Sequence, residues 1–189
     1  MTKIKNIPDK WLELLEKSPK DESLFRFCIK KFIIPKIFTN VRFVKGSDEL
    51  RKFLYVEYPD IITGCSANSV FLKCSDEFRK FLLGEYPDGI TTNSCDAVFL
   101  ECSDEFCIFL LEEYPEKVTE DAINKKFLQA GTATCRMLLK KCPEKITSSS
   151  ANEVFEKKAY EDLRDLLLKK CPEKLDLNIV YSRLTRLDT

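Results

Sequence analysis

The order of apolar and polar residues along this chain follows a pattern that repeats. Each copy of the pattern ends on a proline, and successive prolines at positions 59, 87, 115, 143 and 172 lie 28, 28, 28 and 29 residues apart. Counted from such a proline, the positions 8, 11, 12 and 15 residues later are mostly apolar. This i, i+3, i+4, i+7 spacing is typical of one face of an α-helix. One aromatic position recurs in that face, and we expect its side chains in the core: Phe71, Phe99, Phe127 and Phe155.

A second apolar stripe runs up to each proline and predicts a second helix. Before Pro87 it consists of Phe78, Phe81, Leu82 and Leu83. The proline disfavours helix in the residue before it, so the second helix should end there. Serines placed to cap the second helices are Ser47, Ser75 and Ser103. Threonines placed to cap the first helices are Thr63, Thr91, Thr119 and Thr147.

A fixed period in this range is the sequence signature of a solenoid. We therefore predict an all-α fold, an α-solenoid of about six short antiparallel two-helix repeats of about 28 residues, with about thirteen helices in all. One domain is expected over residues 1–189. It divides into an irregular N-terminal capping unit (1–46), regular repeats (47–174) and a C-terminal capping helix (175–189).

The two capping units depart from the regular repeat. At the N-terminus we expect a helix at Asp9–Lys17, a degenerate copy in which Ser23 takes the place of Ser47, and a shortened helix at about Asn40–Val44. At the C-terminus a last helix near 176–186 should present a polar end. Its charged residues are Arg183, Arg186 and Asp188.

The later repeats resemble a known family. Val118–Ala122 (VTEDA), the small-residue turn Ala130–Ala133, Met137–Lys141 (MLLKK) and Glu144–Ile146 (EKI) are similar to the ankyrin-like helical repeats of fungal NACHT-type receptor proteins. The resemblance covers roughly residues 60–175. It lacks the T-P-L-H-x-A signature and the 33-residue period of true ankyrin repeats. The resemblance implies a recognition scaffold and carries over no catalytic residues.

Charge and composition exclude several classes of partner. Lys plus Arg equals Asp plus Glu at 31 each, so no net field draws the chain to nucleic acid or to an acidic membrane. Nowhere do 18 apolar residues run together, and residues 1–20 contain no apolar core like that of a signal peptide. The chain has no histidine, which removes the commonest general base and metal ligand. We expect no cofactor.

The nine cysteines recur at repeat positions, which favours buried thiols over a disulfide framework. Two of them take the place of a tyrosine that precedes the proline in other repeats. We predict no disulfide, a reducing cytoplasmic location, and burial of at least Cys74, Cys102, Cys142 and Cys171. Cys142 and Cys171 follow lysine pairs that could lower a thiol pKa, yet each lies at a helix C-terminus, where the dipole disfavours thiolate.

One polar position recurs nine residues after each proline: Asn68, Asp96, Asn124 and Asn152. One interpretation is a row of hydrogen bonds that is solvated or bridges helices. The other is a protein-binding stripe, joined by Ser69, Lys125 and Glu153 one position on. We predict a non-enzymatic, monomeric scaffold that binds another protein through an extended helical face. One alternative is an enzyme or small-ligand carrier with its site in a concave groove. A third possibility is a repeat fragment whose effector domain lies on another chain.

Overall fold

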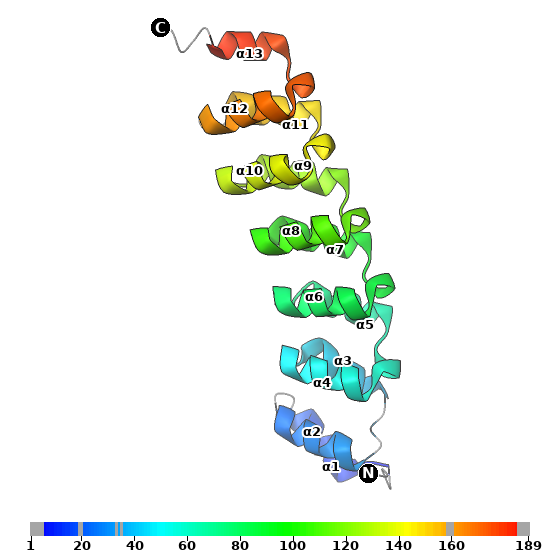
Figure 1. Ribbon diagram of the computed structural model, residues 1–189. Coiled ribbons are helices and arrows are strands. Elements are labelled where there is room, and N and C mark those ends of the chain that lie inside the picture. The colour runs from blue at the N-terminus through cyan, green and yellow to red at the C-terminus, as the bar shows by residue number, and fades with distance from the viewer. Residues whose placement is uncertain (1–5, 19–20, 33, 35, 158–160, 185–189) are drawn as a thin grey trace. The chain divides into compact units, whose positions relative to one another are not determined.

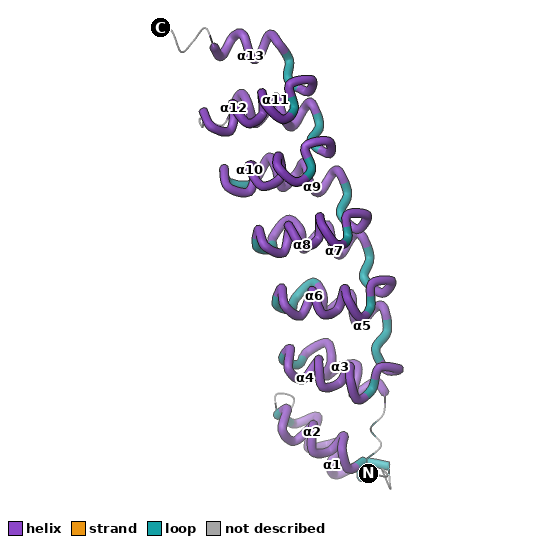
Figure 2. The backbone as a smooth tube through the Cα atoms, in the orientation of Figure 1, coloured by secondary structure: helices purple, strands orange, loops and turns teal. Residues whose placement is uncertain are grey.

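A computed structural model of the chain describes residues 6–18, 21–32, 34, 36–157 and 161–184. Over these residues the structure consists of α-helices, short 3₁₀ turns and loops, and contains no β-strand (Figures 1 and 2). The all-α prediction is confirmed. Thirteen α-helices follow one another in the described part of the chain, as the periodicity predicted.

The chain divides into two compact units, Met1–Ile90 and Thr91–Thr189. The helices of the first unit are α1 (Asp9–Lys17), α2 (Glu22–Lys31), α3 (Lys36–Lys45), α4 (Asp48–Glu57), α5 (Gly64–Phe71) and α6 (Asp76–Glu85), with 3₁₀ turns η1 (Pro59–Ile61) and η2 (Pro87–Gly89). Those of the second are α7 (Thr92–Glu101), α8 (Asp104–Glu113), α9 (Glu120–Gln129), α10 (Thr132–Lys141), α11 (Ser148–Lys157), α12 (Glu161–Lys170) and α13 (Leu177–Leu184), with η3 (Pro115–Lys117), η4 (Pro143–Lys145) and η5 (Pro172–Lys174). The single-domain organisation stays a prediction.

Within the second unit, first helices pack against first helices and second helices against second helices. Among the first helices, α7 contacts α9 and α9 contacts α11. Among the second helices, α8 contacts α10 and α10 contacts α12. Figure 1 shows each pair as one layer of this unit. In the first unit α1 packs on α2, α3 on α4 and α5 on α6, and α3 also contacts α5.

The recurring phenylalanine anchors each layer. Phe71, Phe99 and Phe127 are fully buried and Phe155 is 1% exposed, so this prediction is confirmed. Phe43 of α3 occupies the same position, 16 residues before the next proline, and is also buried. A buried side chain of this size contributes roughly 1.5–3 kcal/mol to folding by leaving water.

The predicted helix caps are present. The hydroxyls of Ser75 and Thr119 accept hydrogen bonds from the backbone N–H of Phe78 (3.3 Å) and Ala122 (3.2 Å). The same bond forms at the other predicted caps: Ser47, Ser103, Thr63, Thr91 and Thr147. Second helices end at the residue before the proline, and the proline then opens a 3₁₀ turn that our sequence analysis did not predict.

The N-terminal unit differs from the sequence expectation in two places. The side chain that caps α2 belongs to Asp21, which accepts from Leu24 N–H at 2.8 Å, and Ser23 lies inside the helix. Helix α3 begins at Lys36, whereas we expected a helix at about 40–44. The helix starts earlier because none of the residues from Lys36 to Asn40 is a helix breaker, and the side chain of Thr39 is buried. Helix α1 has the predicted bounds.

The C-terminal helix α13 is present, but the charged end assigned to it is not described: the side chain of Arg183, and Arg186 and Asp188 entirely, lie outside the described residues. None of the helices in the described ranges combines the length and the apolar composition needed to cross a lipid bilayer.

Candidate functional site

The clearest polar cluster in the second unit surrounds Asn124 in α9. Its Nδ2 donates to the carbonyl oxygens of Glu120 and Lys145, each at 2.8 Å. Its Oδ1 accepts from the backbone N–H of Thr147 at 2.8 Å and from the Thr147 hydroxyl at 3.1 Å. The residue is 8% exposed. One side chain thus ties α9 to the end of η4 and to the residue that caps α11.

The other members of the row make equivalent bonds to the following repeat. Asn152 donates to Lys174 O (3.3 Å) and accepts from Asp176 N–H (2.8 Å). Asp96 has no amide donor, yet its carboxylate accepts from Thr119 N–H (2.9 Å) and from the Thr119 hydroxyl (2.8 Å). This recurrence is the helix-bridging row that we weighed as one interpretation.

In the first unit Asn68 makes the same link. Its Nδ2 donates to Gly64 O at 3.1 Å and to Gly89 O at 2.7 Å. Each side chain of the row, from Asn68 to Asn152, is therefore engaged within the chain. A role of these positions in partner binding stays a prediction. Any contact with a partner would be made mainly by the neighbouring side chains, because those of the row bond within the chain.

A shallow groove of about 630 Å³ lies above the Asn124 cluster, between α9 and α11. The lining residues are polar or charged except for Leu128, and their charges are of both signs: Glu120, Asp121, Asn124, Lys125, Leu128, Thr147, Ser149 and Ser150. Of the two predicted stripe residues in the groove, Asn124 lies at its buried floor and Lys125 is exposed. The groove therefore joins a fixed floor to solvent-facing charged groups.

The position after the row is the variable one. It holds Ser69, Ala97, Lys125 and Glu153 in successive repeats. Ala97 and Lys125 are exposed, and Ser69 and Glu153 are half-buried. The side chain that links repeats is therefore Asn or Asp in each repeat, while the residue after it changes in size and charge.

A further repeated contact was missed by our sequence analysis. Eight residues before each proline stands a hydrogen-bond donor that reaches the carbonyl of the buried phenylalanine and closes the end of the first helix. Arg79 Nε donates to Phe71 O at 2.9 Å, and Cys135 Sγ lies 3.2 Å from Phe127 O. The full set is Arg51, Arg79, Cys107, Cys135 and Arg164. Alignment of the repeats contains this signal, because only Arg and Cys occur there.

Lysine side chains supply a second kind of link between repeats in the second unit. Lys126 is only 8% exposed, and its ammonium donates to the carbonyl oxygens of Leu100 (3.1 Å) and Cys102 (3.2 Å) at the end of α7. Lys174 donates to Pro143 O, Glu144 O and Ile146 O in the preceding turn. These cations satisfy carbonyl groups that a helix or turn leaves without an internal partner.

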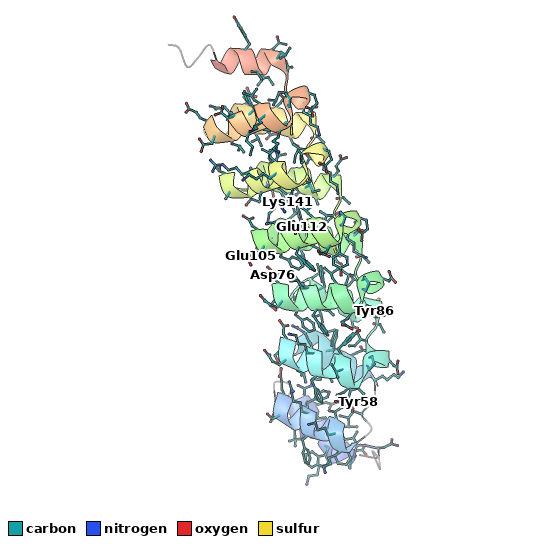
Figure 3. All side chains as sticks on the ribbon, in the orientation of Figure 1. Tyr58, Asp76, Tyr86, Glu105, Glu112 and Lys141 are labelled. Carbon is teal, nitrogen blue, oxygen red and sulfur yellow. The ribbon has the colours of Figure 1, made fainter. Side chains whose placement is uncertain are left out.

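Ion pairs add to the links between second helices. Lys141 of α10 pairs with Glu112 of α8, both labelled in Figure 3, and Arg136 of α10 pairs with Asp162 of α12. All four side chains are at least 39% exposed, so each pair contributes little to stability.

The cysteines weighed as nucleophiles are unsuited to that chemistry. Burial raises the pKa of Cys142 to about 11 and also raises the pKa of Cys171. Cys74 is similar, with its pKa raised to about 12 by burial. Three of the four cysteines predicted to be buried are so, and Cys102 is half-buried.

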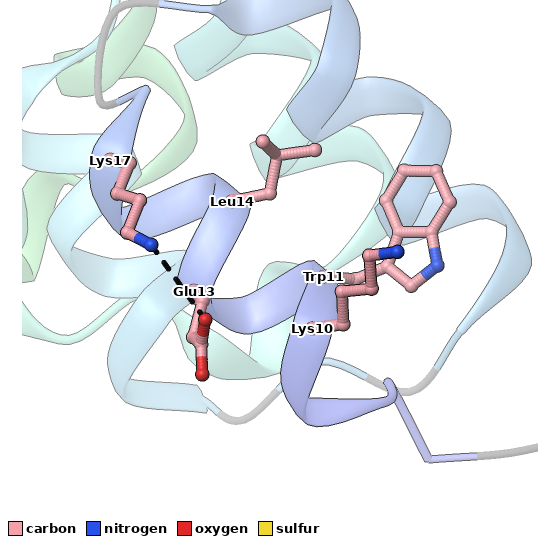
Figure 4. A pocket seen from close by; sticks show the side chains of 5 residues that line it. All are labelled: Lys10, Trp11, Glu13, Leu14 and Lys17. Atoms are coloured by element: carbon pink, nitrogen blue, oxygen red, sulfur yellow. Dashed lines mark ion pairs between the residues drawn. The ribbon is translucent and has the colours of Figure 1, made fainter.

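A second cavity lies at the surface of α1. It has a volume of about 370 Å³ and is lined by Lys10, Trp11, Glu13, Leu14 and Lys17 (Figure 4). Lys17 pairs with Glu13 across it at 3.8 Å, and the Trp11 ring packs against Phe27 at 5.9 Å. The lining comes from one helix and contains none of the predicted site residues.

Among the described residues there is no cluster of three or more acidic, cysteine or histidine side chains able to hold a metal ion. Comparison of the chain with protein-family models, curated proteins and solved structures finds no match.

Proposed function

We propose that this chain is a binding scaffold whose partner is another protein. Its ankyrin-like two-helix repeats would continue as one α-solenoid and present their first helices as the recognition face. The proposal rests on one observation. In every repeat of the Asn68–Asn152 row an Asn or Asp side chain bonds to the backbone or cap of the following repeat, whereas the residue one position on differs in size and charge.

That combination suits recognition for a physical reason. The Asn124 bonds fix the backbone of the groove before any partner arrives, so little ordering is left to oppose binding. The exposed side chains then determine which surface fits. With Glu120, Asp121 and Lys125 on its walls, the groove matches a polar protein surface that carries both charges.

A cytoplasmic, monomeric protein fits the same proposal. Cysteines at buried repeat positions are typical of a reducing compartment, where thiols persist. The balanced charge of the chain matches the mixed charge of the groove and gives nucleic acid no advantage over a protein partner.

The experiment is affinity capture with matched charge reversals. The groove variant combines Asp121→Lys with Lys125→Glu, and the control variant combines Glu105→Lys with Lys140→Glu on the second helices. All four residues are exposed, and each variant keeps the net charge at zero. We expect a protein captured by the wild-type chain, once purified, to bind the groove variant at least about tenfold more weakly, a loss of about 1.4 kcal/mol.

The control variant should bind that purified protein as the wild type does. Equal binding by all three chains, or a loss confined to the control variant, would contradict the assignment of the face.

A further inference from the structure

Two cysteine positions of the repeat coincide in one repeat. The first follows the first helix, and the second, five residues later, is the donor position that faces the phenylalanine carbonyl. Residues 59–86 carry Cys74 and Arg79 at these positions, and residues 115–142 carry Ala130 and Cys135. Residues 87–114 carry cysteine at both positions, Cys102 and Cys107.

The structure brings these two sulfur atoms together. Cys102 Sγ lies 3.4 Å from Cys107 Sγ, and the two point at the same acceptor, Phe99 O, at 3.7 and 3.5 Å. A disulfide bond is about 2.05 Å long, so the sulfur atoms must approach by about 1.4 Å to form one. Cys102 is the C-cap of α7, and Cys107 lies in the first turn of α8.

Access to the pair is one-sided. Cys102 is half-buried, whereas Cys107 is fully buried. An outside reagent can therefore reach Cys102 first, and Cys107 is placed to react only with the sulfur beside it. This is the arrangement of an attacking and a resolving thiol.

We propose that Cys102 and Cys107 form a reversible disulfide, with the disulfide of a small thiol, such as oxidised glutathione, as oxidant. The Cys102 thiolate attacks one sulfur of the oxidant, forms a mixed disulfide and releases one molecule of the small thiol. The Cys107 thiolate then attacks Cys102 Sγ and releases the second. The protein loses two protons and two electrons, and the oxidant is reduced to two thiols.

Closure acts on the contact between the two helices of one repeat. It removes two S–H donors from Phe99 O and ties the end of α7 to the first turn of α8. Lys126 of α9 holds the carbonyl of Cys102 at 3.2 Å, so a shift of this C-cap also reaches the next repeat. Oxidation at this site would therefore change the contacts that α7 makes with α8 and α9 inside the second unit.

The test is mass spectrometry of the full-length chain in excess oxidised glutathione. The starting protein carries Cys65→Ser, because Cys65 is exposed and would add an unrelated mixed disulfide. We expect the folded protein to lose two hydrogens, to gain no glutathione, and to yield a peptide pair linked through Cys102 and Cys107. Dithiothreitol should restore the starting mass.

Single substitutions identify the two roles. With Cys107→Ser the protein should retain one glutathione on Cys102, and with Cys102→Ser position 107 should stay a thiol. Cys74→Ser and Cys135→Ser are the matched controls from neighbouring repeats, and each should leave the bridge intact. If a single-substitution variant folds poorly, the protein that retains both Cys102 and Cys107 still provides the test. A folded protein without the linked peptide, or with glutathione held on Cys102 while Cys107 is present, overturns the proposal.

Discussion

Asn124 shows how a single polar side chain can join two repeats. In the sequence it was ambiguous, since an Asn inside a helix is as compatible with solvent exposure as with burial. The structure places acceptors and donors on both sides of the amide, at Lys145 and Thr147 of the following turn. Neither partner is adjacent in sequence, which is why spacing alone could not choose between the two interpretations.

Replacement of Asn124 by Ala should therefore destabilise the protein. The carbonyl of Lys145 and the N–H of Thr147 lose their partner in a site that is 8% exposed, and each group left unsatisfied costs about 1–3 kcal/mol. Denaturant melts measure the loss. The matched control is Lys125→Ala, one residue on and exposed, which should change stability by less than about 0.5 kcal/mol. Equal stability of the two variants would contradict the structural role of the amide.

Phe99 is a second residue whose effect can be stated in advance. Its ring is fully buried, so truncation to Ala leaves a cavity that the surrounding side chains fill only in part. We expect Phe99→Ala to lower the free energy of unfolding by about 3–5 kcal/mol. Glu101→Ala, two residues away and exposed, is the control. A loss below about 1 kcal/mol for Phe99→Ala would mean that the aromatic row is not the core.

At the scale of helices, most of what the sequence predicted follows from local rules. The Ser and Thr caps, the stop before each proline and the buried phenylalanine depend on residues within one or two turns of each other. The 3₁₀ turns and the start of α3 were missed. They depend on how the chain continues after the proline, and a local pattern fits more than one path there.

The candidate site was predictable only in part, for the same reason. The row of Asn and Asp and its neighbours was recognised from the period. The groove between α9 and α11 required contacts between repeats, as did the link from Lys126 to the end of α7. Cys102 is half-buried although Cys74, at the same repeat position, is buried, so the repeat position alone does not predict the burial of this cysteine.

A carboxylate link between α4 and α6 makes a pH-dependent prediction. Asp48 accepts from the Ser75 hydroxyl at 2.5 Å and from Arg51 Nη1 at 2.6 Å. Burial alone would raise the pKa of this carboxyl, but the bonds from Ser75 and Arg51 outweigh burial and hold its pKa below the ordinary value. The folded state thus favours the ionised form. The resulting stability is present above the unfolded pKa of about 3.9 and is lost as the pH falls through the folded value.

Asp48→Asn should accordingly reduce stability at pH 7 by on the order of 1 kcal/mol. The difference from wild type should shrink as the pH falls from about 5 to below the folded pKa. Denaturant melts of both proteins across this range provide the measurement. Asp60→Asn, an exposed carboxylate in η1, is the control and should follow the wild type. A difference that stays constant with pH would show that the charge of Asp48 is not what stabilises the link.

At the scale of the whole molecule, the repeats of the second unit bury their apolar faces against one another. The second unit contains three complete helix pairs and α13, with its own row of phenylalanines and its own Asp96, Asn124 and Asn152 links. In repeat proteins stability is approximately a sum of the repeats and of the interfaces between neighbours. Stability should therefore depend on how many complete pairs remain in a fragment, more than on which end of the chain is removed.

A fragment of residues 91–189 should consequently fold without residues 1–90. The cut leaves Thr91 as the cap of α7 and keeps all three pairs of the second unit, so we expect a helical circular dichroism spectrum and cooperative unfolding at a lower denaturant midpoint than the full chain. The comparison is a fragment of residues 105–189, which loses α7 and the Ser103 cap and leaves α8 without its partner helix. That fragment should be less stable, because it lacks Phe99, whose ring is buried and whose carbonyl oxygen lies 3.5 Å from Cys107 Sγ. An unfolded 91–189 fragment, or equal stability of the two, would contradict repeat-by-repeat stabilisation.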